Sequence, residues 1–232
     1  MEKQKYAAIV LAAGSGKRMN SQVHKQYLII QDRPVLYYSL KEFEDSAVDE
    51  IVLVVGKGEE EFCRREIVDK YGISKVKAIV EGGKERYHSV FEGLKQTSDA
   101  DYVLIHDGAR PFVNQDIIRR CMQEVQKYQA CVVGMPVKDT IKIADEEGYA
   151  KQTPDRKNVW MIQTPQTFSY ALIYEAYEEM LKTEDTAITD DAMVLERIKG
   201  KKSKLIEGSY RNIKITTPED LLIANVYLQY PE

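Results

Sequence analysis

Short, continuous apolar runs alternate with amphipathic segments along most of the chain. The apolar runs lie at Tyr6–Val10, Ile51–Val55, Val76–Val80, Tyr102–Ile105 and Cys131–Gly134. The amphipathic, helix-like segments lie at about 59–70, 85–94, 115–127 and 170–181. Continuous apolar strands are typical of a parallel sheet that is covered on both faces. The repeated strand–helix units therefore predict an α/β fold, in which helices flank a mostly parallel twisted sheet and the crossovers are right-handed.

A glycine loop with adjacent cations directly follows the first predicted strand. Residues 11–19 read Leu-Ala-Ala-Gly-Ser-Gly-Lys-Arg-Met, and a further cation, Lys25, comes shortly after them. Gly14 and Gly16 leave no side chain between the backbone N–H groups and a ligand, while the Lys-Arg pair brings positive charge. This combination is typical of a loop that binds phosphates, although a glycine turn with solvated basic residues has the same composition.

Two well-known phosphate loops do not fit these residues. The dinucleotide fingerprint G-x-G-x-x-G, begun at Gly14, requires a glycine where this chain has Met19. The mononucleotide P-loop requires Gly-Lys followed by Ser or Thr, whereas Gly16 and Lys17 are followed by Arg18. The loop is therefore predicted to be a phosphate site of another kind.

Two more glycine-bearing polar segments follow predicted strands. Residues 81–89 read Glu-Gly-Gly-Lys-Glu-Arg-Tyr-His-Ser, and residues 106–111 read His-Asp-Gly-Ala-Arg-Pro. Each segment by itself is compatible with a turn or a helix cap. Because the carboxyl ends of parallel strands meet at one edge of the sheet, the three segments together predict a ligand site at that edge. We expect His106, at this edge, to be a hydrogen-bonded structural residue.

The stretch at about 136–163 departs from the strand–helix pattern. It mixes β-type residues with turns and contains no good helical segment. A structureless loop of that length is unusual within a compact domain, so we expect a protruding β-arm. The chain ends with a helix that begins after Thr217, a good N-cap followed by proline, and runs to about Gln229. Residues 1–232 are therefore expected to form a single domain with an arm.

Composition narrows the classes of function. A formal net charge of -4 over 232 residues argues against a general nucleic-acid binder. No apolar run approaches the length needed to span a membrane, and the N-terminus lacks the core of a signal peptide, so we expect a cytoplasmic protein. The three cysteines are widely spaced without a C-x-x-C pair, which predicts buried core residues rather than disulfides or a zinc site.

An ordered set of motifs resembles one enzyme family along nearly the whole chain. The motifs are Leu11–Met19, Lys25–Tyr27, Gly82–Ser89, His106–Pro111, Pro136–Lys142, Gln163–Gln166, Thr189–Ala192 and Asn212–Thr216. The set resembles the 2-C-methyl-D-erythritol 4-phosphate cytidylyltransferases of non-mevalonate isoprenoid biosynthesis, which belong to the sugar-alcohol-phosphate cytidylyltransferases. The resemblance implies a Rossmann-like nucleotidyltransferase fold, CTP and a sugar-alcohol phosphate as substrates, Mg²⁺ held mainly through the CTP phosphates, and a homodimer formed through the β-arm.

The resemblance also implies roles for individual residues. The implied nucleotide-binding residues are Ala12, Ala13, Gly14, Gly16, Arg18, Lys25, Gly83, Ser89, Asp107, Gly108 and Lys214. The implied binding residues for the sugar-alcohol phosphate are Asp107, Arg110, Thr140, Arg156, Thr164 and Lys214. The implied catalytic cations are Arg18, Lys25, Arg156 and Lys214. No direct protein ligand of the metal is implied, and Asp107 is the only residue that we expect to reach it through a water molecule.

Two of these cations have other interpretations in the sequence alone. Arg156 lies in Pro-Asp-Arg-Lys and would by itself be read as a solvated charge. Lys214 lies between Ile213 and Ile215, an alternation that predicts a strand with the lysine on one face. Burying an unpaired lysine there would be costly, and a bound phosphate would offset that cost.

Two alternative functions stay open. The ribitol-5-phosphate cytidylyltransferases share the fold and CTP, but the loop Ala12–Gly14, Asp139-Thr140 and the segment 189–191 resemble the methylerythritol enzymes more closely. A non-catalytic nucleotide-binding regulator on the same fold is the other alternative, because fold does not fix function. The chain also departs from the family pattern at two positions: His24 replaces the usual proline, and Lys84 stands where an acid is common.

Overall fold

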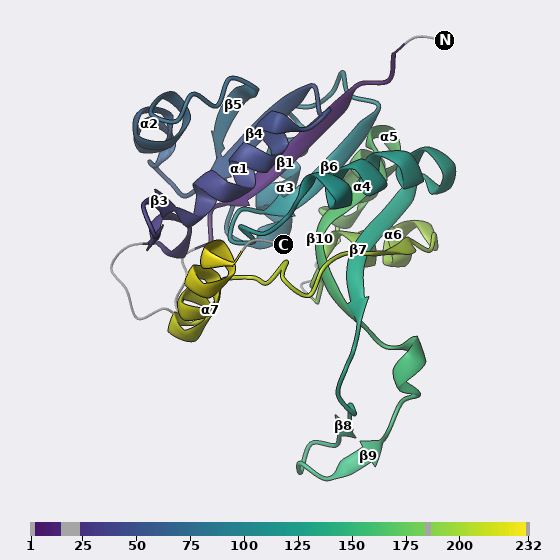
Figure 1. Cartoon of the computed structure of the whole chain (residues 1–232). Coiled ribbons are helices and arrows are strands. Elements are labelled where there is room, and N and C mark those ends of the chain that lie inside the picture. Colours follow the sequence, from purple (N-terminus) through teal and green to yellow (C-terminus); the bar gives the residue numbers. More distant parts are fainter. Residues whose placement is uncertain (1–2, 15–23, 184–186, 231–232) are drawn as a thin grey trace.

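The computed structural model of the chain describes residues 3–14, 24–183 and 187–230. Within these ranges a seven-stranded sheet crosses the molecule in the order β11-β7-β10-β6-β1-β4-β5 (Figure 1). Its strands are β1 (Tyr6–Ala12), β4 (Glu50–Val55), β5 (Val76–Glu81), β6 (Tyr102–Asp107), β7 (Ala130–Pro136), β10 (Trp160–Ser169) and β11 (Lys204–Glu207). Strand β10 pairs antiparallel with β6 and β7, and every other pair is parallel. The predicted mostly parallel sheet is confirmed.

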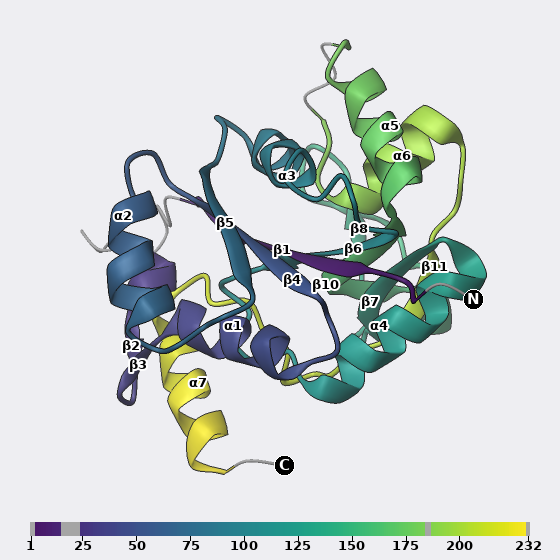
Figure 2. The same cartoon turned by 90° about the horizontal axis from the view of Figure 1, so that it is seen from above.

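Helices cover both faces of this sheet, as Figure 2 shows from above. The helices are α1 (Val35–Asp45), α2 (Glu60–Cys63), α3 (Arg86–Leu94), α4 (Gln115–Tyr128), α5 (Tyr170–Met180), α6 (Asp191–Lys199) and α7 (Pro218–Gln229). One core lies between the sheet and α1, α2 and α4, and a second core lies between the sheet and α3, α5 and α6. This two-sided cover explains why all six residues of β4 are buried and why five of them, Ile51–Val55, form a continuous apolar run.

Local capping signals fix where several helices begin. Helix α7 starts with Pro218 after the capping box that Thr217 and Asp220 form, in agreement with the predicted N-cap. In α4, the side chain of Asn114 accepts a hydrogen bond from the backbone N–H of Ile117. Helix α4 ends at Gln129, whose φ of 62° lies in the left-handed region and stops the helix.

Some elements differ from the sequence-based prediction. The helix predicted over 59–70 is the short α2 followed by a π-helical segment, Arg64–Asp69. The prediction missed α1, α6, the edge strand β11, and the small hairpin of β2 (Ile29–Ile30) and β3 (Arg33–Pro34). Short edge strands such as β11, with only Ile206 buried, carry too little periodicity to be recognised.

The segment between β7 and β10 extends away from the body of the molecule (Figure 1). It carries a two-stranded sheet of β8 (Ile143–Ala144) and β9 (Ala150–Gln152), and then the 3₁₀ turn η4 (Arg156–Asn158). The N–H of Val137 donates to the carbonyl of Val159 at its base. Because β7 runs through Pro136 and β10 begins at Trp160, the segment outside the main sheet is 137–159, shorter than the expected 136–163.

The cysteines lie in the core, as their spacing predicts. Cys63, Cys121 and Cys131 are buried and carry free thiols. Helices long and apolar enough to cross a membrane are absent from the described part of the chain.

Candidate active site

A pocket of about 580 Å³ lies at the carboxyl ends of β1, β5 and β6. Its lining comes from the end of β1, the turn at 25–27, the loop before α3, the end of β6 and the segment after β11. The lining residues are Leu11, Ala12, Ala13, Gly14, Lys25, Gln26, Gly83, Lys84, Glu85, Arg86, Ser89, Asp107, Ala109, Lys214 and Thr216. The pocket therefore lies at the sheet edge where the sequence predicts a ligand site.

Close packing of small residues shapes one wall of the pocket. A Cβ atom on Gly82 would lie 2.5 Å from the Cβ of Ala13 and 2.6 Å from Oγ of Ser89, so only glycine fits there. The Ser89 hydroxyl accepts the N–H of Gly83 at 3.1 Å and donates to the carbonyl of Glu85 at 3.3 Å. Glu85 in turn is the N-cap of α3. The loop before α3 is thus held against the end of β1, with its backbone facing the pocket.

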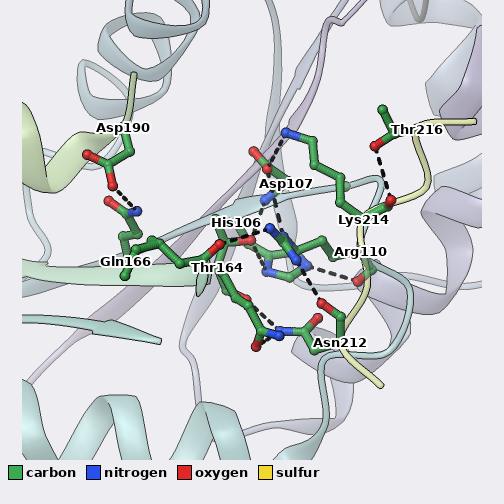
Figure 3. A network of polar contacts seen from close by, with 12 residues as sticks. His106, Asp107, Arg110, Thr164, Gln166, Asp190, Asn212, Lys214 and Thr216 are labelled. Atoms are coloured by element: carbon green, nitrogen blue, oxygen red, sulfur yellow. Dashed lines mark hydrogen bonds and ion pairs between the residues drawn. The ribbon is translucent and has the colours of Figure 1, made fainter. Parts of the chain in front are cut away.

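Asp107, the last residue of β6, faces three cations. Its Oδ2 lies 2.7 Å from Nζ of Lys214 (Figure 3) and 4.0 Å from Nε of Arg110, and its Oδ1 lies 3.3 Å from Nε of Arg86. Burial by itself would raise the pKa of this carboxyl, but the attraction of Arg86, Lys214 and Arg110 outweighs it and holds the pKa well below its usual range. Asp107 is therefore ionised at neutral pH and fixes where the ammonium of Lys214 lies.

Arg86 connects Asp107 to the α5–α6 region. Its guanidinium donates to both carboxylate oxygens of Asp191, at 2.7 and 2.8 Å. Asp191 is fully buried at the start of α6, and the hydroxyl of Tyr177 donates to its Oδ1 at 2.6 Å. A bidentate arginine–carboxylate pair fixes the plane of the guanidinium. Arg86 thereby connects the pocket to α6, which covers the same face of the sheet as α3.

Behind Asp107, His106 is a structural residue, as the sequence predicts. Its Nε2 lies 3.2 Å from the carbonyl of Arg110, which can only accept, so Nε2 carries the proton. Its Nδ1 then accepts from the hydroxyl of Thr164 at 3.1 Å, and the same hydroxyl accepts the N–H of Asp107 at 3.1 Å (Figure 3). Thr164 thus helps to fix the end of β6, and burial lowers the pKa of His106 to about 4.

The strand predicted around Lys214 is wrong. Residues 212–216 pair with no strand, and their link to β6 is the N–H of Ile215, which donates to the carbonyl of Ala109 at 2.8 Å. Ile215 is buried, but the side chain of Lys214 is 37% exposed and paired with Asp107. Alternation therefore predicted an extended backbone correctly, whereas the lysine is partly exposed and has Asp107 as a partner without a bound phosphate.

The comparisons with known proteins agree with one another. A family model described as 2-C-methyl-D-erythritol 4-phosphate cytidylyltransferase matches residues 6–230. A relative of that name from Lachnospira eligens is 54% identical over 224 residues, covering 96% of this chain and 98% of the relative. Another, from Lachnoclostridium phytofermentans, is 50% identical over 226 residues, or 97% of each chain. This chain belongs to the 2-C-methyl-D-erythritol 4-phosphate cytidylyltransferase family.

Solved structures of the family support the same assignment. The crystal structure of 4-diphosphocytidyl-2C-methyl-D-erythritol synthase from Anaerococcus prevotii is 38% identical, with a TM-score of 0.86 over 97% of this chain and 96% of that one. The cytidylyltransferase of Thermus thermophilus is 29% identical, with a TM-score of 0.77, and covers 95% of this chain. The resemblance, the Rossmann-like α/β fold and the nucleotidyltransferase class expected from the sequence are therefore confirmed.

The structure brings together only part of the residue set that the cytidylyltransferase resemblance implies. Ala12, Ala13, Gly14, Lys25, Gly83, Ser89, Asp107 and Lys214 line the pocket. Gly16 and Arg18 lie outside the described residues. Gly108, Arg110 and Thr164 are not in the lining; the N–H of Gly108 is taken up by the carbonyl of Leu11 at 2.8 Å. Thr140 and Arg156 are exposed on the arm and do not line this chain's own pocket.

The sequence reasoning missed Arg86 and Asp191 as site residues of this cytidylyltransferase. Both lie inside motifs that carry the family resemblance, Gly82–Ser89 and Thr189–Ala192, but nothing in their spacing shows that they meet. Gln26 was missed as well; it is buried, lines the pocket and donates to the carbonyl of Ala12. In the sequence, only its place directly after Lys25 pointed to Gln26 as a site residue.

Side chains of this cytidylyltransferase do not form a metal centre in the described ranges. No group of three or more His, Cys, Asp or Glu residues there is placed to hold a metal ion. Asp107, which we expected to reach a metal through water, has both oxygens facing cations, Lys214 on one side and Arg86 on the other. Asp107 therefore does not fit as a magnesium ligand while these pairs are in place.

Proposed function

We propose that this chain transfers the cytidylyl group of CTP to 2-C-methyl-D-erythritol 4-phosphate in the pocket at the carboxyl ends of β1, β5 and β6. The products are 4-diphosphocytidyl-2-C-methyl-D-erythritol and pyrophosphate. The observation that carries the proposal is the meeting of Lys25, Arg86 and Lys214 beside a wall of small residues, in a chain of this family. Such a pocket offers backbone groups and positive charge to a triphosphate.

The reaction needs positioned charge rather than a protein nucleophile. An oxygen of the substrate phosphate attacks the α-phosphorus of CTP, and the bond from that phosphorus to the pyrophosphate oxygen breaks. The attacking phosphate monoester is already largely ionised near neutral pH. Negative charge spreads over the five-coordinate phosphorus, so cations that face this group lower the barrier.

Lys25 and Arg18 are the proposed stabilisers of that charge. Nζ of Lys25 donates to the carbonyl of Ile215 at 3.0 Å, which places it next to Lys214 within the pocket. Ile215 is the residue that follows Lys214 in the chain. Two ammonium groups therefore reach the same region from different segments, one from the turn η2 and one from the segment after β11.

Lys214 is proposed to hold a phosphate in exchange for part of its contact with Asp107. The pairing with Asp107 keeps the ammonium in the pocket before a substrate binds. We propose that Asp107, Arg110 and Thr164 shape the side of the pocket that takes the sugar alcohol. Thr164 and Arg110 act there through the end of β6, because both are hydrogen-bonded to its backbone or its histidine.

We propose that the reaction requires Mg²⁺ held mainly through the CTP phosphates. Magnesium keeps several of its waters and binds readily to triphosphate oxygens. It would supply positive charge for the leaving pyrophosphate. The side chains of the described residues offer it no ligand set, so no step of this proposal depends on a protein-bound metal.

The proposed functional unit is a homodimer joined through the arm. Ile143 and Tyr149 on the arm are 45% and 70% exposed, which favours their being covered by another copy. Arg156 extends from the same arm, and we propose that it contacts the substrate phosphate in the pocket of the partner subunit. Thr140 would accompany it from the other side of the arm.

A pyrophosphate-release assay tests the proposal. Purified protein with CTP and Mg²⁺ is expected to release pyrophosphate with 2-C-methyl-D-erythritol 4-phosphate, and far more slowly with ribitol 5-phosphate. Faster release with ribitol 5-phosphate would transfer the assignment to the alternative cytidylyltransferase. Binding of CTP without release with either substrate would support the non-catalytic regulator.

A further inference from the structure

One carboxylate outside the pocket contacts both ends of the turn that carries Lys25. The turn is η2, residues Lys25–Tyr27. Oε2 of Glu59 accepts the hydroxyl of Tyr27 at 2.8 Å, and Oε1 of Glu59 lies 2.7 Å from Nδ1 of His24, without a hydrogen bond between these two atoms. His24 precedes Lys25 and Tyr27 ends the turn, so a single side chain that does not line the pocket lies against both ends of the turn.

Glu59 is itself fixed to the end of a buried strand. Its Oε2 also accepts the N–H of Gly56 at 2.9 Å, directly after β4. A Cβ atom on Gly56 would lie 2.6 Å from that oxygen, so the carboxylate packs closely against the backbone at this glycine. The end of β4 therefore sets the position of Glu59. Through Glu59, the turn that carries Lys25 is hydrogen-bonded to the central sheet.

The surroundings keep this contact intact near neutral pH. Burial, and then the neighbouring Cys63 and Glu59, raise the pKa of Tyr27, so its hydroxyl stays protonated and donates. Burial raises the pKa of Cys63 to about 11, and its thiol lies 3.0 Å from the same hydroxyl. The ring of Phe62 packs edge-on against Tyr27, with centroids 5.1 Å apart.

Inside the pocket, the turn is held by contacts of its side chains. Lys25 donates to the carbonyl of Ile215, and Gln26 donates to the carbonyl of Ala12. Tyr27, the third residue of the turn, is instead bound by Glu59, which does not line the pocket. A displacement of about 1 Å in a catalytic group lowers a rate by roughly a hundredfold, so the contact between Glu59 and Tyr27 matters for the reaction.

We infer that Glu59 is a positioning residue, which sets the place of the Lys25 ammonium by joining Tyr27, the last residue of the turn, to the end of β4 through hydrogen bonds. This inference rests on the proposed role of Lys25 at the CTP phosphates. Glu59 touches no substrate in this account; it acts only through the turn.

The first test compares two carboxylates of the same segment. Glu59→Ala is expected to lower kcat about 10- to 100-fold and to weaken CTP binding, with the KM for the sugar-alcohol phosphate nearly unchanged. Glu59→Gln keeps an acceptor for Tyr27 and Gly56 and is expected to recover most of the rate. Glu61→Ala removes an exposed carboxylate two residues further along α2 and serves as the matched control, with wild-type kcat.

The decisive test is a double-mutant cycle with Lys25→Ala, followed by single-turnover rates with enzyme in excess and by CTP titration calorimetry. If Glu59 acts through Lys25, Glu59→Ala has no further effect once Lys25 is absent. An equal fold-loss in both backgrounds, or a wild-type rate in folded Glu59→Ala, overturns the inference. If Glu59→Ala does not fold, Tyr27→Phe, which removes the same contact, takes its place in the cycle. A near-normal rate in Lys25→Ala would instead overturn the proposed role of Lys25.

Discussion

Arg86 and Asp191 lie 105 residues apart in the chain and form a bidentate ion pair, with N–O distances of 2.7 and 2.8 Å. The pair connects the first residue of α3 to the first residue of α6. The remaining nitrogen of the guanidinium, Nε, faces Asp107. The same arginine therefore contributes to the packing of two helices and to the orientation of a carboxylate in the pocket.

Asp191→Ala is expected to destabilise the fold by about 3 to 5 kcal/mol, because it leaves the charge of Arg86 without its main partner. The hydroxyl of Tyr177 would also lose its acceptor. Urea denaturation measures the loss, with Glu196→Ala, an exposed carboxylate on the same helix, as the control. A loss below about 1 kcal/mol would place the pair among surface salt bridges and contradict its structural role.

Replacing both partners should separate stability from activity. In Arg86→Met/Asp191→Leu no unpaired charge is left, so most of the stability lost in Asp191→Ala should return. The turnover of the double variant should be below that of the wild type, because Asp107 no longer faces Arg86. Parallel denaturation and pyrophosphate-release measurements on the double variant check this; recovery of full turnover would show that Arg86 has no part in the site.

Because His106 is buried, we expect the free energy of unfolding to decrease as the pH falls. Burial lowers its folded-state pKa to about 4 from the ordinary value of 6.5, so the unfolded chain takes up the proton first. Stability is full above pH 6.5 and is lost as pH falls toward 4, by about 3 kcal/mol from this residue. The free energy of unfolding, measured between pH 7.5 and 4 for the wild type and His106→Gln, should show a smaller decrease in the variant. Equal decreases would rule out His106 as the cause.

Lys25→Ala and Arg18→Ala are each expected to lower kcat by about a hundred- to a thousandfold, the usual effect of removing one donor from developing charge. Lys25 lines the pocket rather than the core, so the melting temperature of Lys25→Ala should change by only a few degrees. Steady-state kinetics and thermal melting of the two variants measure both effects. A well-folded variant with near-normal turnover would remove that residue from the mechanism.

The α/β architecture could be predicted from the sequence because the central strands of the sheet are buried on both faces. Every residue of β4 is buried, and the apolar run Ile51–Val55 is typical of a strand that is covered on both faces. Helix α1 was missed although Val35, Leu36, Leu40 and Phe43 are buried at helical spacing, so that signal was present. The extended run around Lys214 was recognised, but an extended backbone need not pair with a strand.

The site was predictable only where its residues follow strands. Lys25, Asp107 and the glycine-bearing loops stand directly after strands or close to them, and the sheet brings them together. The partners of Arg86 and Tyr27 are Asp191 and Glu59, and these pairs depend on how helices pack on the sheet. No local pattern in a sequence encodes such contacts, which is why both pairs were missed.

We propose that the pocket of one chain works with the arm of another. Arg156 is exposed on the arm, donates to the carbonyl of Lys138 at 2.8 Å and does not line its own chain's pocket. Mixing Arg156→Ala subunits with Lys25→Ala subunits gives heterodimers in which one of the two pockets has an intact Lys25 and receives an intact Arg156.

The most direct measurement is the rate of pyrophosphate release by that mixture after subunit exchange, with heterodimer formation confirmed by mass spectrometry. Random exchange makes half of the dimers mixed, each with one intact site, so we predict roughly a quarter of the wild-type rate from two inactive parents. If Arg156 served its own chain, each site of the heterodimer would carry one defect. A mixture that forms heterodimers and stays as inactive as its parents would contradict the shared site.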